Sequence, residues 1–415
     1  MIKKTIIFIS FLLILISTAN SQSIQKITGR ITNLKDSTSV SYAHIGILGS
    51  SIGTISNKNG DFEIKGNFNP DQDTLMISHI EYKMQCIPLK MLTANKNHIQ
   101  LKRNQYILAD VVVLPEKEKN KIIKNVIDNI SKNYSDGMYQ SKAFYREIQY
   151  DKKTKTYSRL IEAALTIQDE KVTAPISKIK CSVQQLRKSN NYTDVHAGCK
   201  RLINSFDTPL PNQLHILLRD NPIRSHKATK HSGLHNDLRF IYEKKLDQLK
   251  LIGTIHENDE SIYVLQYSYR DYTSTFYVNK SNYALLKFEH KLESKTALIY
   301  QRTYLFKQIG DKYYPAFFNY ESISDIRSNK GGLGYTINSL TFVDHNLNKK
   351  TFKRIAYKDV IPKHIDLYDI KMEYDQNFWA NYNIMLEDPI GNKVISDLEK
   401  QNSLQRQFEE NARIK

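Results

Sequence analysis

Cysteine is scarce in this chain, with three residues in 415, at Cys86, Cys181 and Cys199. Three thiols exclude a fold held together mainly by disulfides, because such frameworks use an even set of cysteines in a much shorter chain. In an oxidising compartment, Cys181 and Cys199 are able to close a loop worth about 3 kcal/mol. Three free thiols are the alternative, and the sequence leaves both open.

Long hydrophobic runs are also missing. The apolar stretch at residues 6–16 has about 11 residues, whereas a membrane-spanning helix needs about 18 or more. Lys3 and Lys4 precede this stretch and Ala19-Asn20-Ser21 follows it, which is the order of a cleaved signal peptide. We predict a leader at residues 1–21 and an exported mature protein, in the periplasm or associated with the outer membrane. A retained anchor helix is the alternative, and peripheral membrane association stays open.

The motifs of known catalytic and metal sites give no convincing match either. The chain has no His-Glu-x-x-His, and its Gly-x-Ser-x-Gly match at Gly49-Ser50-Ser51-Ile52-Gly53 lies in a turn of the predicted sandwich, not in a turn from a strand to a helix. The Gly-rich residues 331–334 precede a strand pattern, so they offer no helix N-terminus for a phosphate. His226, His231 and His235 come nearest to a metal set, but Gly233 between them indicates a loop. We therefore predict no catalytic residues, no metal ligands and no cofactor.

Charge of one sign is in excess. Lys and Arg number 60 and Asp and Glu 43, for a formal net charge of +17. Such a surface attracts polyanions such as lipopolysaccharide or acidic glycans. The alternative is an ordinary solvated surface, because the basic residues are spread along the chain. Export makes nucleic acid an unexpected partner.

Apolar residues alternate near the N-terminus, which is typical of strands with one buried face. The alternating residues are Ile27, Gly29, Ile31, Ala43, Ile45, Ile47, Phe62 and Ile64. Asn59-Gly60-Asp61 supplies a turn with positive φ. About seven short strands, the last of them at 111–113, predict a β-sandwich over residues 22–115.

Four motifs of this segment belong together: Gly29-x-Ile31, Ala43-His44-Ile45-Gly46-Ile47, Gly53-Thr54-Ile55-Ser56-Asn57-x-x-Gly60-x-Phe62-x-Ile64, and Leu108-Ala109-Asp110-Val111-Val112-Val113. With them, residues 25–115 resemble the carboxypeptidase-regulatory-like domain family, which is common in exported Bacteroidetes proteins. Ser41 stands where the family usually has Pro. The resemblance implies a transthyretin-like sandwich and no peptidase activity.

The rest of the chain is predicted to be an amphipathic linker helix at 116–136 and an antiparallel β-rich domain at 137–412. The helix carries Ile123, Val126, Ile127 and Ile130 on one face and Lys on the other, and we expect it to pack on its own domain. Binding to a membrane surface is the alternative. Consecutive strand patterns joined by short turns predict a larger curved, half-barrel-like sheet, followed by a C-terminal helix. The fold class is mainly β with a few helices.

Two further resemblances lie in this domain. The order Ile262-Tyr263-Val264-Leu265, Phe276-Tyr277-Val278-Asn279 and Tyr283-Ala284-Leu285-Leu286-Lys287 resembles the half-barrel of periplasmic lipoprotein carriers. Phe144-Tyr145-Arg146-Glu147 and Tyr374-Asp375-x-x-Phe378-Trp379-x-x-Tyr382-Asn383 resemble the region that follows the sandwich in other Bacteroidetes proteins, which implies no activity. Tyr263, Tyr267, Tyr269 and Tyr277 are candidates for lining a groove that binds apolar groups or sugar rings. Half-buried packing is the alternative.

Together these patterns predict a non-enzymatic binding or scaffold protein of the cell envelope. The sandwich is expected to dock, and the curved sheet to bind a lipid, lipoprotein, glycan or protein partner. One alternative is a hydrolase of unrecognised type that uses Arg146, Glu147 or the three histidines. The other is a binder of polyanions or lipopolysaccharide that acts through its net positive charge.

Overall fold

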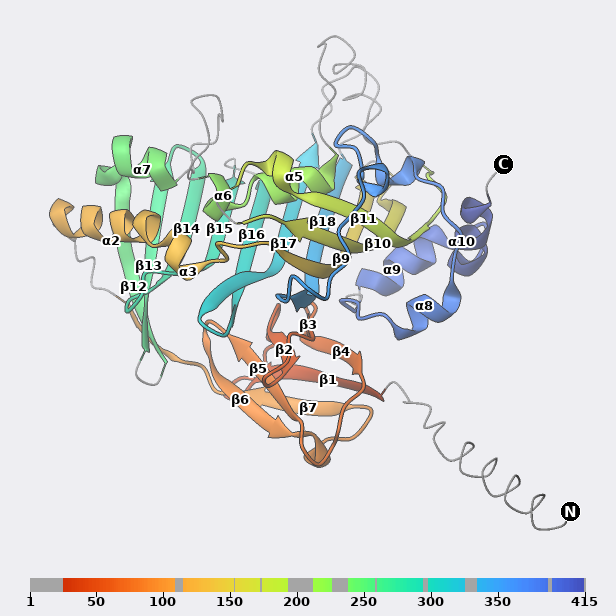
Figure 1. The fold of residues 1–415 in the computed structure, drawn as a ribbon, viewed down its shortest axis with the longest axis horizontal. Helices are drawn as coiled ribbons and strands as arrows, with labels where there is room; N and C mark the ends of the chain where they lie inside the picture. Colours follow the sequence, from red (N-terminus) through yellow and green to blue (C-terminus); the bar gives the residue numbers. More distant parts are fainter. Residues whose placement is uncertain are drawn as a thin grey trace, which may run out of the picture.

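The computed structural model describes residues 25–108, 115–152, 154–171, 174–192, 212–225, 238–257, 260–293, 298–324, 334–386 and 390–413. Within them, a small β-sandwich precedes an eleven-stranded sheet with helices on both faces (Figure 1). This architecture confirms the predicted mainly β class. The predicted leader at 1–21 and the predicted strand at 111–113 lie outside the described residues.

The sandwich consists of seven strands in two sheets. One sheet has the order β4-β1-β7, from Asp61–Gly66, Gln25–Asn33 and Asn97–Leu101. The other has the order β3-β2-β5-β6, from Gly53–Ile55, His44–Ile47, Thr74–His79 and Tyr82–Pro88. The alternating apolar residues of the sequence form the core between them. Gly60 has a φ of +79°, and a Cβ there would lie 2.2 Å from the carbonyl oxygen of Ile31, so the turn requires glycine.

The large sheet is antiparallel throughout, with the order β11-β10-β9-β18-β17-β16-β15-β14-β13-β12-β8. Its strands are β8 Gln105–Leu108, β9 Tyr139–Asp151, β10 Thr156–Asp169, β11 Lys180–Lys188, β12 Leu249–Glu257, β13 Glu260–Tyr269, β14 Tyr272–Asn279, β15 Leu285–Glu293, β16 Leu298–Ile309, β17 Lys312–Ser324 and β18 Gly334–Asn346. Strands β12 to β18 lie next to one another in the sheet in sequence order, as the meander pattern predicts. β8 lies inside the range predicted for the sandwich, yet it pairs with β12 at the edge of the large sheet.

Both faces of the large sheet are covered. We call inner the face that packs against α2 Glu116–Asp128, α3 Ile130–Asn133, α5 Gln213–Arg219, α6 Pro222–Ser225 and α7 Leu238–Lys244. The outer face packs against the sandwich and α8 Gln376–Asn381, α9 Ile390–Leu398 and α10 Leu404–Ala412. The helix predicted at 116–136 is divided at Asn129 into α2 and α3, and its apolar residues join the inner core. No helix in the described ranges has the length and hydrophobicity to span a membrane.

The sandwich is docked on the large domain by polar and aromatic contacts. Asn383, in the signature after α8, accepts from the backbone N–H of Lys65 at 2.7 Å and donates to the carbonyl of Lys65 at 2.9 Å. Tyr42 stacks on Phe317 of the outer face, with ring centroids 5.0 Å apart. Lys307 of β16 lies 3.4 Å from Nε2 of His44. These contacts orient the sandwich against the outer face, away from the inner one.

Candidate functional site

Strand register places an unbroken row of rings and apolar side chains across the inner face. The members pair in turn from β9 to β13 and are Tyr145, Leu340, Phe318, Tyr304, Phe288, Phe276 and Leu265. Neighbouring ring centroids lie between 4.7 and 6.1 Å apart. We call this set the aromatic row. Between β13 and β17 it crosses four strand spacings, about 19 Å at about 4.8 Å each.

A second row runs parallel to the first, one inward-facing residue further along each strand. It contains Glu147, Asn338, Tyr320, Arg302, His290, Ser274 and Tyr267, and we call it the polar row. The Ser274 hydroxyl lies 2.8 Å from Nδ1 of His290, and Nε2 of His290 lies 2.8 Å from the Tyr300 hydroxyl. The inner face is therefore amphipathic across its strands: one apolar row lies beside one polar row.

Several polar atoms of the inner face have no partner among the described residues. The side chains concerned are Gln149, Arg159, Tyr267, Arg302, Tyr304, Thr336 and Asn338. All are buried, and Thr336 is 1% exposed and Asn338 0%. A buried polar group without a hydrogen bond costs about 1–3 kcal/mol, and folded proteins keep few of them. These seven residues lie on the inner face, and others with such atoms, such as Thr341 and Trp379, lie elsewhere.

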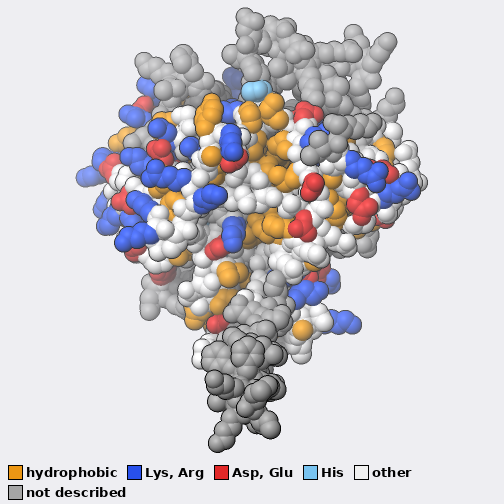
Figure 2. Space-filling view, turned by 45° about the vertical axis from the view of Figure 1, so that its right-hand side comes forward, with side chains coloured by type: hydrophobic (Ala, Val, Ile, Leu, Met, Phe, Trp, Pro, Cys, Tyr) orange, Lys and Arg blue, Asp and Glu red, His pale blue; other side chains and the backbone are white. Residues whose placement is uncertain are grey.

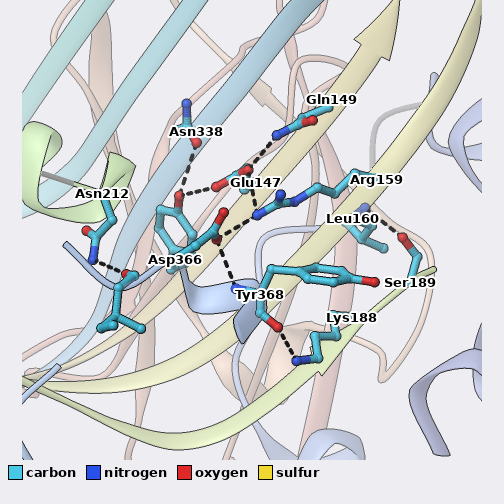
Figure 3. A network of polar contacts seen from close by, with 12 residues as sticks. Glu147, Gln149, Arg159, Leu160, Lys188, Ser189, Asn212, Asn338, Asp366 and Tyr368 are labelled. Carbon is cyan, nitrogen blue, oxygen red and sulfur yellow. Dashed lines mark hydrogen bonds and ion pairs between the residues drawn. The ribbon is translucent and has the colours of Figure 1, made fainter. Parts of the chain in front are cut away.

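At the β9–β11 end of the inner face, charged side chains hold residues 365–370 against the sheet (Figure 3). Arg159 lies between two carboxylates, 2.6 Å from Asp366 and 3.4 Å from Glu147. Lys188 donates to the carbonyl oxygens of Tyr368 and Ile370, and burial lowers the pKa of Lys188 to about 8. The segment that contains η5 (Leu367–Asp369) is thus fixed by charge as well as by the packing of Leu367.

The α5–α6 segment covers the middle of the inner face, and we call it the cover. Its apolar side chains Leu214, Leu217, Leu218 and Ile223 pack on the aromatic row. Asp220, at the C-terminal end of α5, forms an ion pair of 2.7 Å with Arg302 of the polar row. Arg224 of α6 forms a second buried ion pair, with Asp169 of β10. A cavity of about 20 Å³ lies beneath the cover, lined by Leu218, Asn221 and Arg224 and by side chains of the sheet such as Ile167 and Phe318.

The four tyrosines predicted to line a groove are not on one face. Tyr263, Tyr267 and Tyr269 face inward, and Tyr267 is a fully buried member of the polar row. Tyr277 pairs with Val264 and faces outward, where it packs on an apolar cluster with Ile255 and Ile262. Two neighbouring strands contribute side chains to opposite faces at these positions. A ligand role for Tyr263, Tyr267 and Tyr269 stays a prediction.

Of the residues named for the hydrolase alternative, Arg146 and Glu147 do not converge. Arg146 and Glu147 are consecutive on β9 and therefore point to opposite faces. Arg146 lies 2.6 Å from the buried Glu162, which also pairs with Arg187 at 2.5 Å. Burial raises the pKa of Glu162, but the two guanidiniums outweigh it and hold that pKa below its usual value. This charge cluster is therefore a structural ion-pair network on the outer face.

The remaining predicted residues are only partly described. Cys181 is buried in β11, where burial raises the pKa of its thiol to about 12, and Cys199 lies outside the described residues. Their disulfide stays a prediction. His226, His231 and His235 also lie outside, and the described ranges contain no His, Cys, Asp and Glu cluster suited to a metal ion.

The cavities on the outer face and at the surface are larger than the one beneath the cover. One of about 740 Å³, between the sandwich and strands β9 and β18, is lined by residues that include Ser51, Lys142 and Asp344. A cavity of about 60 Å³ lies between the sandwich, the outer face and α9, lined by side chains that include Tyr42, Ile337 and Val394. Figure 2 shows Lys and Arg on both flanks of one side of the molecule, with Asp and Glu among them. The polyanion alternative stays a prediction.

Comparison with known proteins identifies the N-terminal domain. Residues 27–113 match the CarboxypepD_reg-like domain family, which confirms the resemblance of the sandwich. No curated protein sequence matches the chain.

Three solved structures are similar to the chain at low identity. An outer-membrane lipoprotein-sorting protein domain from Vibrio parahaemolyticus has 10% identity and a TM-score of 0.24, over 58% of this chain and 96% of that one. A LolA superfamily protein from Nitrosomonas europaea has 16% identity and a TM-score of 0.22, over 57% and 97%. A membrane-associated protein of unknown function from Bacteroides fragilis has 9% identity and a TM-score of 0.16, over 78% and 98%. The chain thus has a CarboxypepD_reg-like domain at residues 27–113.

Proposed function

We propose that this protein is a non-enzymatic binding protein of the cell envelope, and that its ligand is an amphiphile held on the inner face of the large sheet. The unpartnered polar atoms beside the aromatic row carry this proposal. An apolar tail matches the aromatic row, and a polar head group satisfies atoms that the protein leaves without partners. The leader pattern at residues 1–21 supports an envelope location.

Ligand entry requires the cover to move, because the volume beneath it is about 20 Å³. The cover is attached to the sheet by two ion pairs and by four apolar side chains. An amphiphile replaces these contacts with equivalent ones, since its tail packs on the same rings and its head group meets the same polar row. Replacement of the cover by an amphiphile therefore costs less free energy than the exposure of a wholly apolar core to water.

The sandwich serves as a docking module in this proposal. It occupies the outer face through Asn383, Tyr42 and Lys307, so it leaves the inner face to the ligand. The sandwich and the cover lie on opposite faces of the large sheet, so ligand exchange does not require the sandwich to move.

Titration of the purified mature protein with dodecanol and dodecanoic acid tests the proposal. Calorimetry is expected to show saturable binding of about one ligand per chain, and incubation with ester, peptide and glycan substrates is expected to give no product. Failure to bind either amphiphile would reject ligand binding on the inner face. Turnover of any substrate would reject the non-enzymatic reading.

A further inference from the structure

Arg302 occupies the centre of the polar row in an unusual setting. Its guanidinium carbon lies 5.1 Å from the ring centroid of Tyr300 and 4.8 Å from that of Tyr320, so two rings flank the cation. The side chain is 8% exposed, and neither its Nε nor its Nη1 makes a hydrogen bond among the described residues. A planar guanidinium held between two rings has its donor edge pre-oriented for a carboxylate or a phosphate.

The carboxylate of Asp220 occupies that position in the closed structure. Asp220 belongs to the cover and not to the sheet, and its side chain is 1% exposed. It pairs with Arg302 at 2.7 Å and with its neighbour Arg219 at 2.8 Å. The Arg219 side chain is 48% exposed, so solvent screens its charge, whereas Arg302 and Asp220 form a buried pair.

Movement of the cover takes Asp220 away from Arg302. A buried guanidinium that loses its partner is strongly destabilised, so an empty inner face with a displaced cover is unfavourable. A ligand with a neutral head group leaves Arg302 in that state. A ligand with an anionic head group restores the pair.

We propose, building on the proposed function, that the amphiphile has an anionic head group, a carboxylate or a phosphate, which replaces Asp220 on Arg302. The cover residue is then an internal mimic of the head group. It keeps the site closed without ligand and gives way to an anion of matching geometry. The tail lies along the aromatic row, and the tyrosine rings around Arg302 line the boundary between tail and head group.

The test compares amphiphiles with the same tail: dodecanoic acid, dodecyl phosphate and dodecanol. We expect the full chain to bind the two anions about 10- to 100-fold more tightly than the alcohol, which is the range for a buried charge-assisted hydrogen bond. Arg302→Gln is expected to abolish this preference, because the two anions lose their partner and the alcohol no longer leaves a buried guanidinium unpaired. Asp220→Asn is expected to increase the anion-to-alcohol ratio, because the internal competitor is gone. Arg239→Gln, in the exposed part of α7, removes one positive charge elsewhere and serves as the matched control.

The outcomes separate this inference from the proposed function. Equal binding of acid and alcohol, with a ratio that Arg302→Gln does not change, overturns the anionic head group and leaves amphiphile binding intact. Absence of all binding overturns both. Displacement of dodecanoic acid by inorganic phosphate alone shows a small-anion site and also overturns the inference. If Arg302→Gln does not fold, as judged by circular dichroism, the anion-to-alcohol affinity ratio of Asp220→Asn is the test. An increase in this ratio relative to the unchanged protein supports the inference, and an unchanged ratio contradicts it.

Discussion

Substitution of Thr336 by Val separates stability from ligand binding at one position. Thr336 faces inward on β18, is 1% exposed, and its hydroxyl has no partner among the described residues. Valine has nearly the same shape and removes the unpaired hydroxyl, whose burial costs about 1–3 kcal/mol. For a chain of this size we expect the melting temperature to increase by about 1–4 °C. If Thr336 contacts the head group, the same change removes one hydrogen bond and weakens dodecanoic acid binding by about 2- to 10-fold.

Thr341 provides a matched control on the same strand. It is also 1% exposed with an unpartnered hydroxyl, but it pairs with Phe144 and Phe317 on the outer face. Thr341→Val is expected to increase the melting temperature by a similar amount and to leave the affinity unchanged. Differential scanning calorimetry and a titration monitored by displacement of a fluorescent fatty acid measure the two quantities. Stabilisation by both variants, with equal affinity in both, would show that the unpartnered inner-face hydroxyl has no role in binding.

Three further changes test the framework that positions the site. Burial lowers the pKa of His44 well below its ordinary value, so the stability due to its neutral form is complete above about pH 6.5 and decreases below it. His44→Gln should reduce the slope of unfolding free energy against pH below pH 6.5 by up to about 1.4 kcal/mol per unit, and an unchanged slope would contradict the assignment. Asn383→Ala removes both bonds to Lys65 and should lower the melting temperature of the docked sandwich, whereas Asn381→Ala on exposed α8 should not; equal effects would refute the docking role. Glu162→Gln leaves two guanidiniums without their carboxylate and should destabilise the chain by about 3–5 kcal/mol in urea unfolding, and a loss below about 1 kcal/mol would refute the network.

The sandwich was predictable because its strands obey a simple rule. Ile27, Phe62 and Ile64 alternate with exposed or half-buried positions, and they lie in one core. One face of β4 is buried there and the other is half-buried, so period-two patterning remains visible in the sequence. The Gly60 turn was predictable for the same local reason, since only glycine fits its φ and its approach to Ile31.

The inner face was less predictable because the central strands of the large sheet are buried on both sides. Phe144, Tyr145, Arg146 and Glu147 are each 4% exposed or less, so their sequence has no alternation to read. Without a visible face, the pattern did not reveal that Tyr277 points away from Tyr263. Strand register decides this, and register is set by contacts between distant segments.

Arg302 and Asp220 were missed for a related reason. Arg302 is two residues from both Tyr300 and Tyr304 in β16, so all three side chains lie on the same face of the sheet. An arginine between two aromatic residues on one face was therefore visible in the sequence. Its partner comes from a short helix far away in the sequence, and no local pattern predicts that α5 lies across β16. The net charge of the chain did not point to Arg302 either, because most of the basic residues that give this charge lie on the surface and Arg302 is buried.

The account depends most on the inner face as the site of the ligand. Crosslinking of a dodecanoic acid with a diazirine in its tail, followed by mass spectrometry of the digested protein, tests this directly. We expect labels on residues of the aromatic row, such as Phe288, Tyr304 and Phe318, and loss of labelling with excess dodecanoic acid. Saturable labels confined to the outer cavity near Ile337 and Val394 would contradict the account.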